Sequence, residues 1–436
     1  MTVTPQTSAA PIEGKYFRWL QLAMGIVCMA MIANLQYGWT LFVDPIDAKY
    51  HWGRAAIQLA FTLFVITETW LVPIEAWFVD KYGPSVVIAF GGVMITIAWV
   101  MNSYADTLVL LYTAAVIAGI GAGAVYGTCV GNALKWFPDR RGLAAGATAA
   151  GFGAGAAITV VPIAKMIAAS GYQEAFFTFG IGQGVIVFIL AFFLRKPSQA
   201  MPAKKKQLNL PQTKIDYTPP QVLRSPIFWV MYLVFVMVAA GGLMTAAQIA
   251  PIAHDFKIAN EPVSMLGFQM AALTFAISLD RIFDGFGRPF FGWVSDNIGR
   301  EHTMFIAFST AALMLLTLSL YGHNPIVFVL ATAVYFGVFG EIYSLFPATS
   351  GDTFGVKFAT TNNGMLYTAK GTASLLVPLA SIVAAKYGWQ AVFVIAVALN
   401  AGAALLALFV IKPMRRAFIL GSEAPGDATA RDAKVA

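Results

Sequence analysis

Charged side chains are scarce in this chain. Asp, Glu, Lys and Arg make up 11% of its 436 residues, whereas hydrophobic residues make up 58%. Ordinary soluble proteins carry roughly 25% charged residues, and a bilayer span needs about 20 mostly apolar residues. The shortage of charge therefore excludes a string of soluble domains. It indicates an integral membrane protein that has the lipid bilayer as a partner.

Cysteine and histidine are also rare. The two cysteines, Cys28 and Cys129, both lie inside apolar runs, so neither a disulfide framework nor a thiolate metal site is expected. None of the four histidines is paired with another at helical spacing. These absences argue against a zinc enzyme or an enzyme built on an activated nucleophile. We expect no enzyme activity, no bound metal and no cofactor.

The net charge of +7 could suggest a nucleic-acid partner. The basic residues, however, lie in short loops between apolar runs, where Lys and Arg mark the cytoplasmic side of a membrane protein. They are therefore interpreted as topology signals, and no nucleic-acid partner is expected.

Twelve apolar runs of span length follow one another along the chain. Each is predicted to form a transmembrane helix, so the predicted fold class is an all-α membrane protein. The runs cover residues 17–43, 55–78, 85–103, 107–131, 143–168, 171–194, 226–252, 263–293, 303–321, 325–349, 361–384 and 389–411.

A polar, basic segment divides these runs six and six. It contains three consecutive lysines (Lys204, Lys205 and Lys206) and shows no apolar periodicity. The end of the chain, from about 418, is rich in Gly, Ala, Asp and Glu and is predicted to be disordered. The predicted organisation is two pseudo-symmetric six-helix halves with a linker and a tail, at 1–194, 195–225, 226–412 and 413–436.

The distribution of Lys and Arg predicts the orientation. Most of the 28 basic residues lie in segments on the side of the N-terminus, the linker and the tail. The positive-inside rule therefore places both termini and the linker on the cytoplasmic side of the membrane. We expect this membrane to be a bacterial-type inner membrane. The first fifteen residues are polar and the following run is long enough to span, so no cleavable signal peptide is expected.

A short motif occurs once in each half. Asp80 lies between the second and third spans, and Asp296 between the eighth and ninth; both follow the pattern small-x-x-x-Asp-x-x-Gly. One copy would be read as a tight turn. Two copies at matching positions indicate parallel repeats, as in transporters that rock around a central site. Asp80, Asp296 and Arg300 are therefore candidates for an inner gate.

Glycines in the fourth and fifth spans are interpreted as packing residues. Gly119, Gly123, Gly127 and Gly131 are four apart and line one helix face. Small residues at this spacing allow helices to approach closely in lipid. A nucleotide-binding role for the glycines at 151, 153 and 155 is rejected, because no strand precedes them.

Ionisable side chains inside the spans are the strongest candidates for function, because a charge at mid-bilayer costs about 2.5 kcal/mol or more. Asp280, Asp284 and Arg288 share one face of the eighth span, where Asp284 and Arg288 can pair. Lys370 lies near the middle of the eleventh span. Further acids are Glu68 and Glu75 in the second span and Glu341 in the tenth.

Two buried cations suit an anionic ligand. Arginine offers a planar fork that matches a carboxylate, and lysine a compact point charge. Arg288 and Lys370 could therefore hold both ends of a short dicarboxylate. The alternative is a structural network in which Arg288 pairs with Asp284 and Lys370 with Glu341. Candidates for carrying a coupled proton are Asp284, Glu341, Asp280 and Glu68.

Polar and aromatic residues in other spans could complete a binding cavity. Aromatic walls confine a small planar anion, and hydroxyl and amide groups can bond to it. Taken singly, each residue is equally compatible with packing. The candidates are Gln36, Tyr37, Gln58, Phe61, Tyr126, Phe339, Tyr343 and Tyr367.

The paired motif, the twelve spans and the basic linker resemble the major facilitator superfamily over about 15–412. Within it, the chain is similar to the oxalate:formate antiporter family, which is related to monocarboxylate transporters. The resemblance rests on segments such as 36–41, 58–63, 125–127, 136–144, 287–290, 343–347 and 369–374. It implies that Arg288 and Lys370 are the substrate-binding cations, with Tyr37, Gln58, Tyr126 and Tyr343 around them.

Four residues differ from the family's oxalate exchangers. Tyr367 and Phe339 replace tryptophans, Asp284 replaces an asparagine and Glu341 a glycine. The Asp-x-x-x-Arg pattern at 284–288 instead resembles the proton-coupled monocarboxylate transporters.

We expect a secondary active transporter of small carboxylates that works by alternating access and as a monomer. Oxalate/formate-type exchange is the leading hypothesis. Proton-coupled symport of a monocarboxylate such as lactate, pyruvate or formate is the alternative, and a membrane receptor without transport is a further one. No Gly-x-x-x-x-Gly-Lys-Ser/Thr motif for ATP is present, so the energy source should be a gradient.

Overall fold

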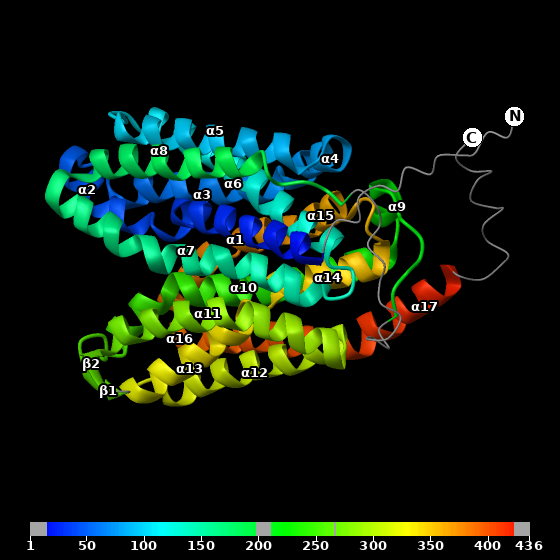
Figure 1. Cartoon of the computed structure of the whole chain (residues 1–436). Helices are drawn as coiled ribbons and strands as arrows, with labels where there is room; N and C mark the ends of the chain where they lie inside the picture. The colour runs from blue at the N-terminus through cyan, green and yellow to red at the C-terminus, as the bar shows by residue number, and fades with distance from the viewer. Residues whose placement is uncertain (1–14, 198–210, 266, 423–436) are drawn as a thin grey trace, which may run out of the picture.

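A computed structural model describes residues 15–197, 211–265 and 267–422. The predicted lysine cluster at 204–206 and the tail beyond 422 lie outside these residues. The fold is almost entirely helical and forms two bundles that lie side by side (Figure 1).

The first bundle is built from the first eight helices. An 11-residue helix, α2, begins within the first predicted span and continues into the segment that was predicted as a loop. A break at Leu71 divides the second predicted span into α3 and α4. The bounds are α1 Lys15–Tyr37, α2 Thr40–Tyr50, α3 Arg54–Trp70, α4 Val72–Tyr82, α5 Pro84–Ser103, α6 Leu108–Trp136, α7 Arg141–Ser170 and α8 Tyr172–Ala191.

The second bundle follows a short helix, α9 (Pro219–Leu223). Its tenth predicted span is divided into α13 and α14, and α16 bends at Gly388. The bounds are α10 Pro226–Asp255, β1 Pro262–Met265, β2 Phe268–Ala271, α11 Ala272–Ile298, α12 Arg300–Tyr321, α13 Pro325–Phe339, α14 Ile342–Phe354, α15 Ala359–Ser374, α16 Val377–Leu406, the π-helical turn η1 Ala407–Ile411 and α17 Lys412–Ser422.

Membrane-spanning character is clear in nine helical segments of the described chain. The other three predicted spans correspond to α7, to α11, and to α15 with the first part of α16. Of these, α11 and α15 carry the intramembrane charges Asp280, Asp284, Arg288 and Lys370. Their polar faces are buried against other helices instead of facing lipid, as is usual for ionisable groups in a membrane.

The two bundles meet along α7 and α15. The first-half helix α7 packs against α11 and α14, and the second-half helix α15 packs against α3, α4 and α6. In Figure 1, α4, α9 and α17 gather at one end of the molecule, and α2, β1 and β2 at the other. We call these ends the linker end and the hairpin end.

The predicted glycine packing is confirmed by close helix approaches. A Cβ at Gly119 or Gly123 would lie 2.6 Å from a backbone oxygen of α3, and one at Gly127 would lie 2.7 Å from Val72. Gly131 faces Thr360 of α15. On α7, a Cβ at Gly146 would lie 2.2 Å from the carbonyl oxygen of Arg288. These contacts leave no room for a larger residue.

Two local predictions were wrong. The run 263–293 was predicted as one span, but residues 262–271 form an antiparallel hairpin that pairs Val263 with Met270. Residues 418–422 were predicted to be disordered, yet they belong to α17. That helix is held by Arg415, which donates to the Glu301 carboxylate and to the Pro211 carbonyl oxygen at 2.7 Å.

The described part of the linker packs against the bundle and is not purely polar. Tyr217 and Val222 are buried. Tyr217 N–H donates to the Phe354 carbonyl oxygen at 2.9 Å. The Asp216 carboxylate accepts backbone N–H groups of Val356 and Lys357 at 2.8 and 2.9 Å. Residues 211–218 thus cover the turn between α14 and α15.

Candidate functional site

Arg288 lies at the centre of the interface between the bundles and is 1% exposed. Its guanidinium forms a two-pronged ion pair with Asp284 one turn earlier on α11, at 3.2 and 2.7 Å. Its other nitrogen donates to the Ala149 carbonyl oxygen of α7 at 2.8 Å, and Tyr37 of α1 lies at 3.4 Å. The predicted Asp284–Arg288 pair is confirmed.

Lys370 of α15 lies in the same cluster and is 3% exposed. Its ammonium group has three donors, and three residues accept them. They are Gln36 of α1 at 3.1 Å, Tyr367 at 3.0 Å and the carboxylate of Glu68 on α3 at 3.1 and 3.3 Å. The alternative pairing of Lys370 with Glu341 is therefore wrong; its ion-pair partner is Glu68.

One aromatic ring contacts both cations. The Tyr343 ring centre lies 4.9 Å from the Arg288 guanidinium and 5.9 Å from the Lys370 nitrogen, both within cation–π range. Tyr126 stacks on Tyr367 at 4.5 Å between ring centres. The structure thus brings Arg288, Lys370 and these predicted tyrosines into one cluster.

Phe152 of α7 is part of this cluster and was not predicted. Its ring lies edge-on to Tyr37 at 5.2 Å and to Tyr126 at 5.6 Å, and 5.9 Å from the Lys370 nitrogen. The flanking glycines, Gly151 and Gly153, were interpreted only as packing residues. A bulky ring flanked by two glycines, of which Gly151 lies at a close helix approach, is the signal that could have identified it.

The remaining predicted wall residues lie further out. Phe339 packs edge-on against Tyr343 at 6.1 Å and faces Gly242 of α10. Phe61 is half-buried on α3, where its ring lies 6.5 Å from Phe64. Gln58 also belongs to α3, but its side chain lies outside the described part of the chain.

Several buried acids have no cation as a hydrogen-bonding partner. Both carboxyl oxygens of Glu341 and of Glu75, and one of Asp280, are buried without a hydrogen-bond partner. Glu341 is at the start of α14 and Asp280 is one turn before Asp284 on α11. Within the described ranges, no three His, Cys, Asp or Glu side chains gather as metal ligands.

At the linker end, each motif aspartate caps a helix of the opposite half. The Asp80 carboxylate accepts the backbone N–H and the hydroxyl of Thr361 at the start of α15, at 3.0 and 2.6 Å. The Asp296 carboxylate accepts the N–H groups of Gly142 and Leu143 at the start of α7, at 3.0 and 2.9 Å. A carboxylate is favoured at a helix N-terminus.

Basic residues complete these caps. Lys135 pairs with Asp80, and Arg300 pairs with Asp296 at 2.6 Å and with Asp352 at 2.8 Å. Asp352 of α14 also pairs with Arg141 of α7 at 2.6 Å, a bridge between halves that the sequence analysis missed. These contacts close the linker end in this conformation.

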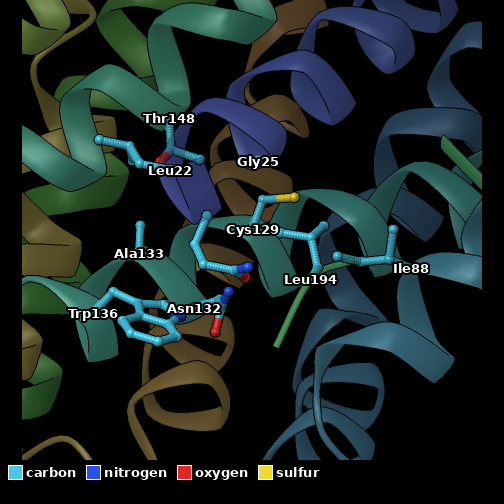
Figure 2. A pocket seen from close by; sticks show the side chains of 10 residues that line it. Leu22, Gly25, Ile88, Cys129, Asn132, Ala133, Trp136, Thr148 and Leu194 are labelled. Carbon is cyan, nitrogen blue, oxygen red and sulfur yellow. The ribbon is translucent and has the colours of Figure 1, made fainter. Parts of the chain in front are cut away.

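A separate hollow lies between α1, α6 and α7 (Figure 2). Its lining includes Cys129, Asn132, Trp136 and Thr148, and none of the Arg288–Lys370 cluster. Its volume is about 10 Å³, near the least that holds one water molecule. It is therefore too small for a carboxylate substrate.

Comparisons with known proteins agree with the geometry. Residues 22–283 and 249–432 match the family described as Major Facilitator Superfamily. The chain is 35% identical to the oxalate:formate antiporter of Oxalobacter formigenes, over 92% of this chain and 93% of that protein. It is 25% identical to human monocarboxylate transporter 11, over 41% of this chain and 38% of that protein.

A solved structure shows the same fold. The proton:xylose symporter XylE, bound to 6-bromo-6-deoxy-D-glucose, matches with a TM-score of 0.71. The match covers 91% of this chain and 96% of that chain at 10% identity. At this identity, the likeness concerns the arrangement of helices alone.

Proposed function

Because this chain belongs to the Major Facilitator Superfamily and is a membrane transporter, not an enzyme, we propose that it carries small carboxylates by alternating access. The substrate lies between Arg288 and Lys370. One observation carries the proposal: both cations already hold a carboxylate in this structure, those of Asp284 and Glu68. A site built around two such pairs suits a ligand with the same chemical group.

Oxalate/formate-type exchange is the first mode of transport. The similarity to the Oxalobacter formigenes antiporter supports it, as do the aromatic rings of Tyr126, Phe152 and Tyr343 around the cations. Flat rings confine a small planar anion and exclude water from it.

Proton-coupled symport of a monocarboxylate is the second candidate. It is favoured by the acids that accompany the cations, because a substrate carboxylate would then have to compete with Asp284 or Glu68. An acid that loses its cation in a buried site is less costly to keep as the neutral, protonated group. Glu341 and Asp280 are further candidates for this proton.

The membrane and orientation belong to the same proposal. We infer that both termini lie in the cytoplasm, because most Lys and Arg residues lie on that side of the spans. The similarity to the Oxalobacter formigenes protein supports a bacterial inner membrane. The linker end would then be the cytoplasmic end, and the caps at Asp80 and Asp296 would close the cytoplasmic gate. The transporter acts as a monomer.

Transport by purified protein in sealed liposomes tests the function. Labelled oxalate or formate outside should enter faster when unlabelled oxalate or formate is inside. Arg288→Lys and Lys370→Gln should each reduce this exchange at least tenfold, whereas Lys165→Gln, at an exposed lysine of α7, should leave it unchanged. Specific binding without any flux would favour a receptor, and neither binding nor flux for oxalate, formate, lactate or pyruvate would refute the proposal.

A further inference from the structure

One of the two central ion pairs lies within a single helix, and the other connects the two halves. Asp284 and Arg288 belong to one helix, α11, so their pair moves as a unit. Glu68 lies on α3 in the first half and Lys370 on α15 in the second. Any opening that separates α3 from α15 must therefore break the Glu68–Lys370 pair.

We propose that Glu68 takes the place of a substrate carboxylate at Lys370, which allows the empty transporter to close and return. The inference rests on the proposed function, carboxylate transport, and extends it to net flux. The Glu68 carboxylate meets Lys370 through both oxygens, at 3.1 and 3.3 Å, as a bound carboxylate would. It is 0% exposed, so the closed site is filled by the protein's own acid.

Charge balance explains why this acid matters. A buried charge left without a partner strongly destabilises a protein. A carrier with an unpaired Lys370 would be destabilised in this way whenever it closed without substrate. Its binding site could then change sides only with substrate bound, so the carrier could only exchange one substrate for another. Glu68 removes the penalty, because the empty closed state then contains a paired lysine.

The same logic links transport to protons. When a substrate carboxylate takes the Lys370 ammonium group, Glu68 loses its cation. It then accepts a proton from water on the open side, so that the closed site gains no net charge with a monoanion. On the other side, the substrate leaves, Glu68 releases the proton and the Glu68–Lys370 pair forms again. One proton crosses with each carboxylate group held at Lys370.

The surroundings of Glu68 provide this choice of partners. Tyr367 donates its hydroxyl to Glu68 at 3.3 Å, and Gln36 shares the Lys370 ammonium. Three further ionisable groups lie around the pair. Tyr126 stacks on Tyr367, and Arg288 contacts the same Tyr343 ring as Lys370. Glu75 is on α4, beyond the break at Leu71. Glu75 has no partner for either oxygen, so it competes for neither cation.

The test compares net uptake with exchange in the same liposomes. Wild-type protein should take up labelled formate into empty vesicles when the outside is acidic. Glu68→Gln should lose this uptake at least tenfold, because its amide cannot neutralise Lys370, while exchange into formate-loaded vesicles stays within about threefold. Glu75→Gln is the matched control: it removes a buried acid on the adjoining helix and should keep both activities.

Each outcome decides the proposal. Wild-type exchange without any net uptake would overturn it and leave the proposed function standing, whereas absence of both would refute the proposed function. Equal net uptake by wild type and Glu68→Gln would also overturn it. If monodisperse Glu68→Gln lost exchange as well, Glu68 would be a substrate-binding residue and the proposal would be wrong. The wild-type measurement is decisive even if the variant does not fold.

Discussion

At the scale of single residues, the hydroxyl of Tyr367 joins both members of the bridge between the halves. It accepts from Lys370 at 3.0 Å and donates to Glu68 at 3.3 Å. Tyr367→Phe removes both bonds and preserves the ring stacked on Tyr126. We expect a loss of about 1–3 kcal/mol in stability, the usual effect of leaving buried polar partners unsatisfied.

Thermal unfolding of the purified protein in detergent measures this loss. The matched variant is Tyr321→Phe on α12, whose side chain is exposed; it should unfold as wild type does. A Tyr367→Phe variant as stable as wild type would contradict the contacts described for Lys370.

Asp284 has a different role from Glu68, because it is on the same helix as its cation. Asp284→Asn keeps one acceptor oxygen for Arg288, but it removes the negative charge and the second acceptor oxygen. We therefore expect exchange within about threefold of wild type and preserved proton-driven uptake. Uptake assays at several external pH values check this. Selective loss of the proton-driven component would transfer the coupling role from Glu68 to Asp284.

At the scale of helices, glycines set how closely the halves approach. A Cβ at Gly146 would lie 2.2 Å from the Arg288 carbonyl oxygen, so Gly146→Val must push α7 away from α11. We expect weaker closure around Arg288 and at least tenfold slower transport. Gly182→Val on α8 is the control, since a Cβ there meets nothing within 4 Å. Transport at the wild-type rate by Gly146→Val would show that this crossing is not needed.

The aspartate caps predict which helix ends separate when the linker end opens. Asp80→Ala and Asp296→Ala each remove the cap from a helix of the opposite half. Loss of a single cap lowers stability by about 1 kcal/mol, and the lost ion pair lowers it further. Both should populate the open form. Thr360→Cys provides a probe of this opening once the two native cysteines are replaced by serine (Cys28→Ser, Cys129→Ser). Position 360 is 0% exposed in the closed state, so a cysteine there becomes accessible only when the linker end opens.

Maleimide labelling of this introduced cysteine should become several-fold faster in both cap variants. Asp106→Ala, in the loop between α5 and α6, should leave the labelling rate unchanged. Unchanged labelling in the two cap variants would mean that the caps stabilise helices without holding the gate.

Much of this arrangement could be predicted from the sequence, because it follows from local patterns. The apolar runs located the spans, and the repeated motif gave Asp80 and Asp296 equivalent positions in the two halves. The four-residue spacing of Asp284 and Arg288 allowed the contact that they make. Partners across halves could not be predicted, since they depend on how two bundles meet. Lys370 could face any buried acid, and only the packing of α15 against α3 selects Glu68 over Glu341.

At the scale of the whole molecule, the contacts between halves fall into two layers. Caps and ion pairs close the linker end, and the Arg288–Lys370 cluster joins the halves through Ala149, Gln36 and Glu68. A carrier that alternates must exchange these contacts for others as it opens. A substrate carboxylate can replace contacts only in the central layer, because both cations there are paired with carboxylates.

The central claim is that a substrate carboxylate binds between Arg288 and Lys370. Titration calorimetry with oxalate and formate on purified wild-type, Arg288→Gln and Lys370→Gln proteins tests it most directly, with size-exclusion chromatography to confirm that each is monodisperse. We predict saturable binding to wild type and at least tenfold weaker binding to both variants, about 1.4 kcal/mol or more. Binding to both variants with wild-type affinity would contradict the account.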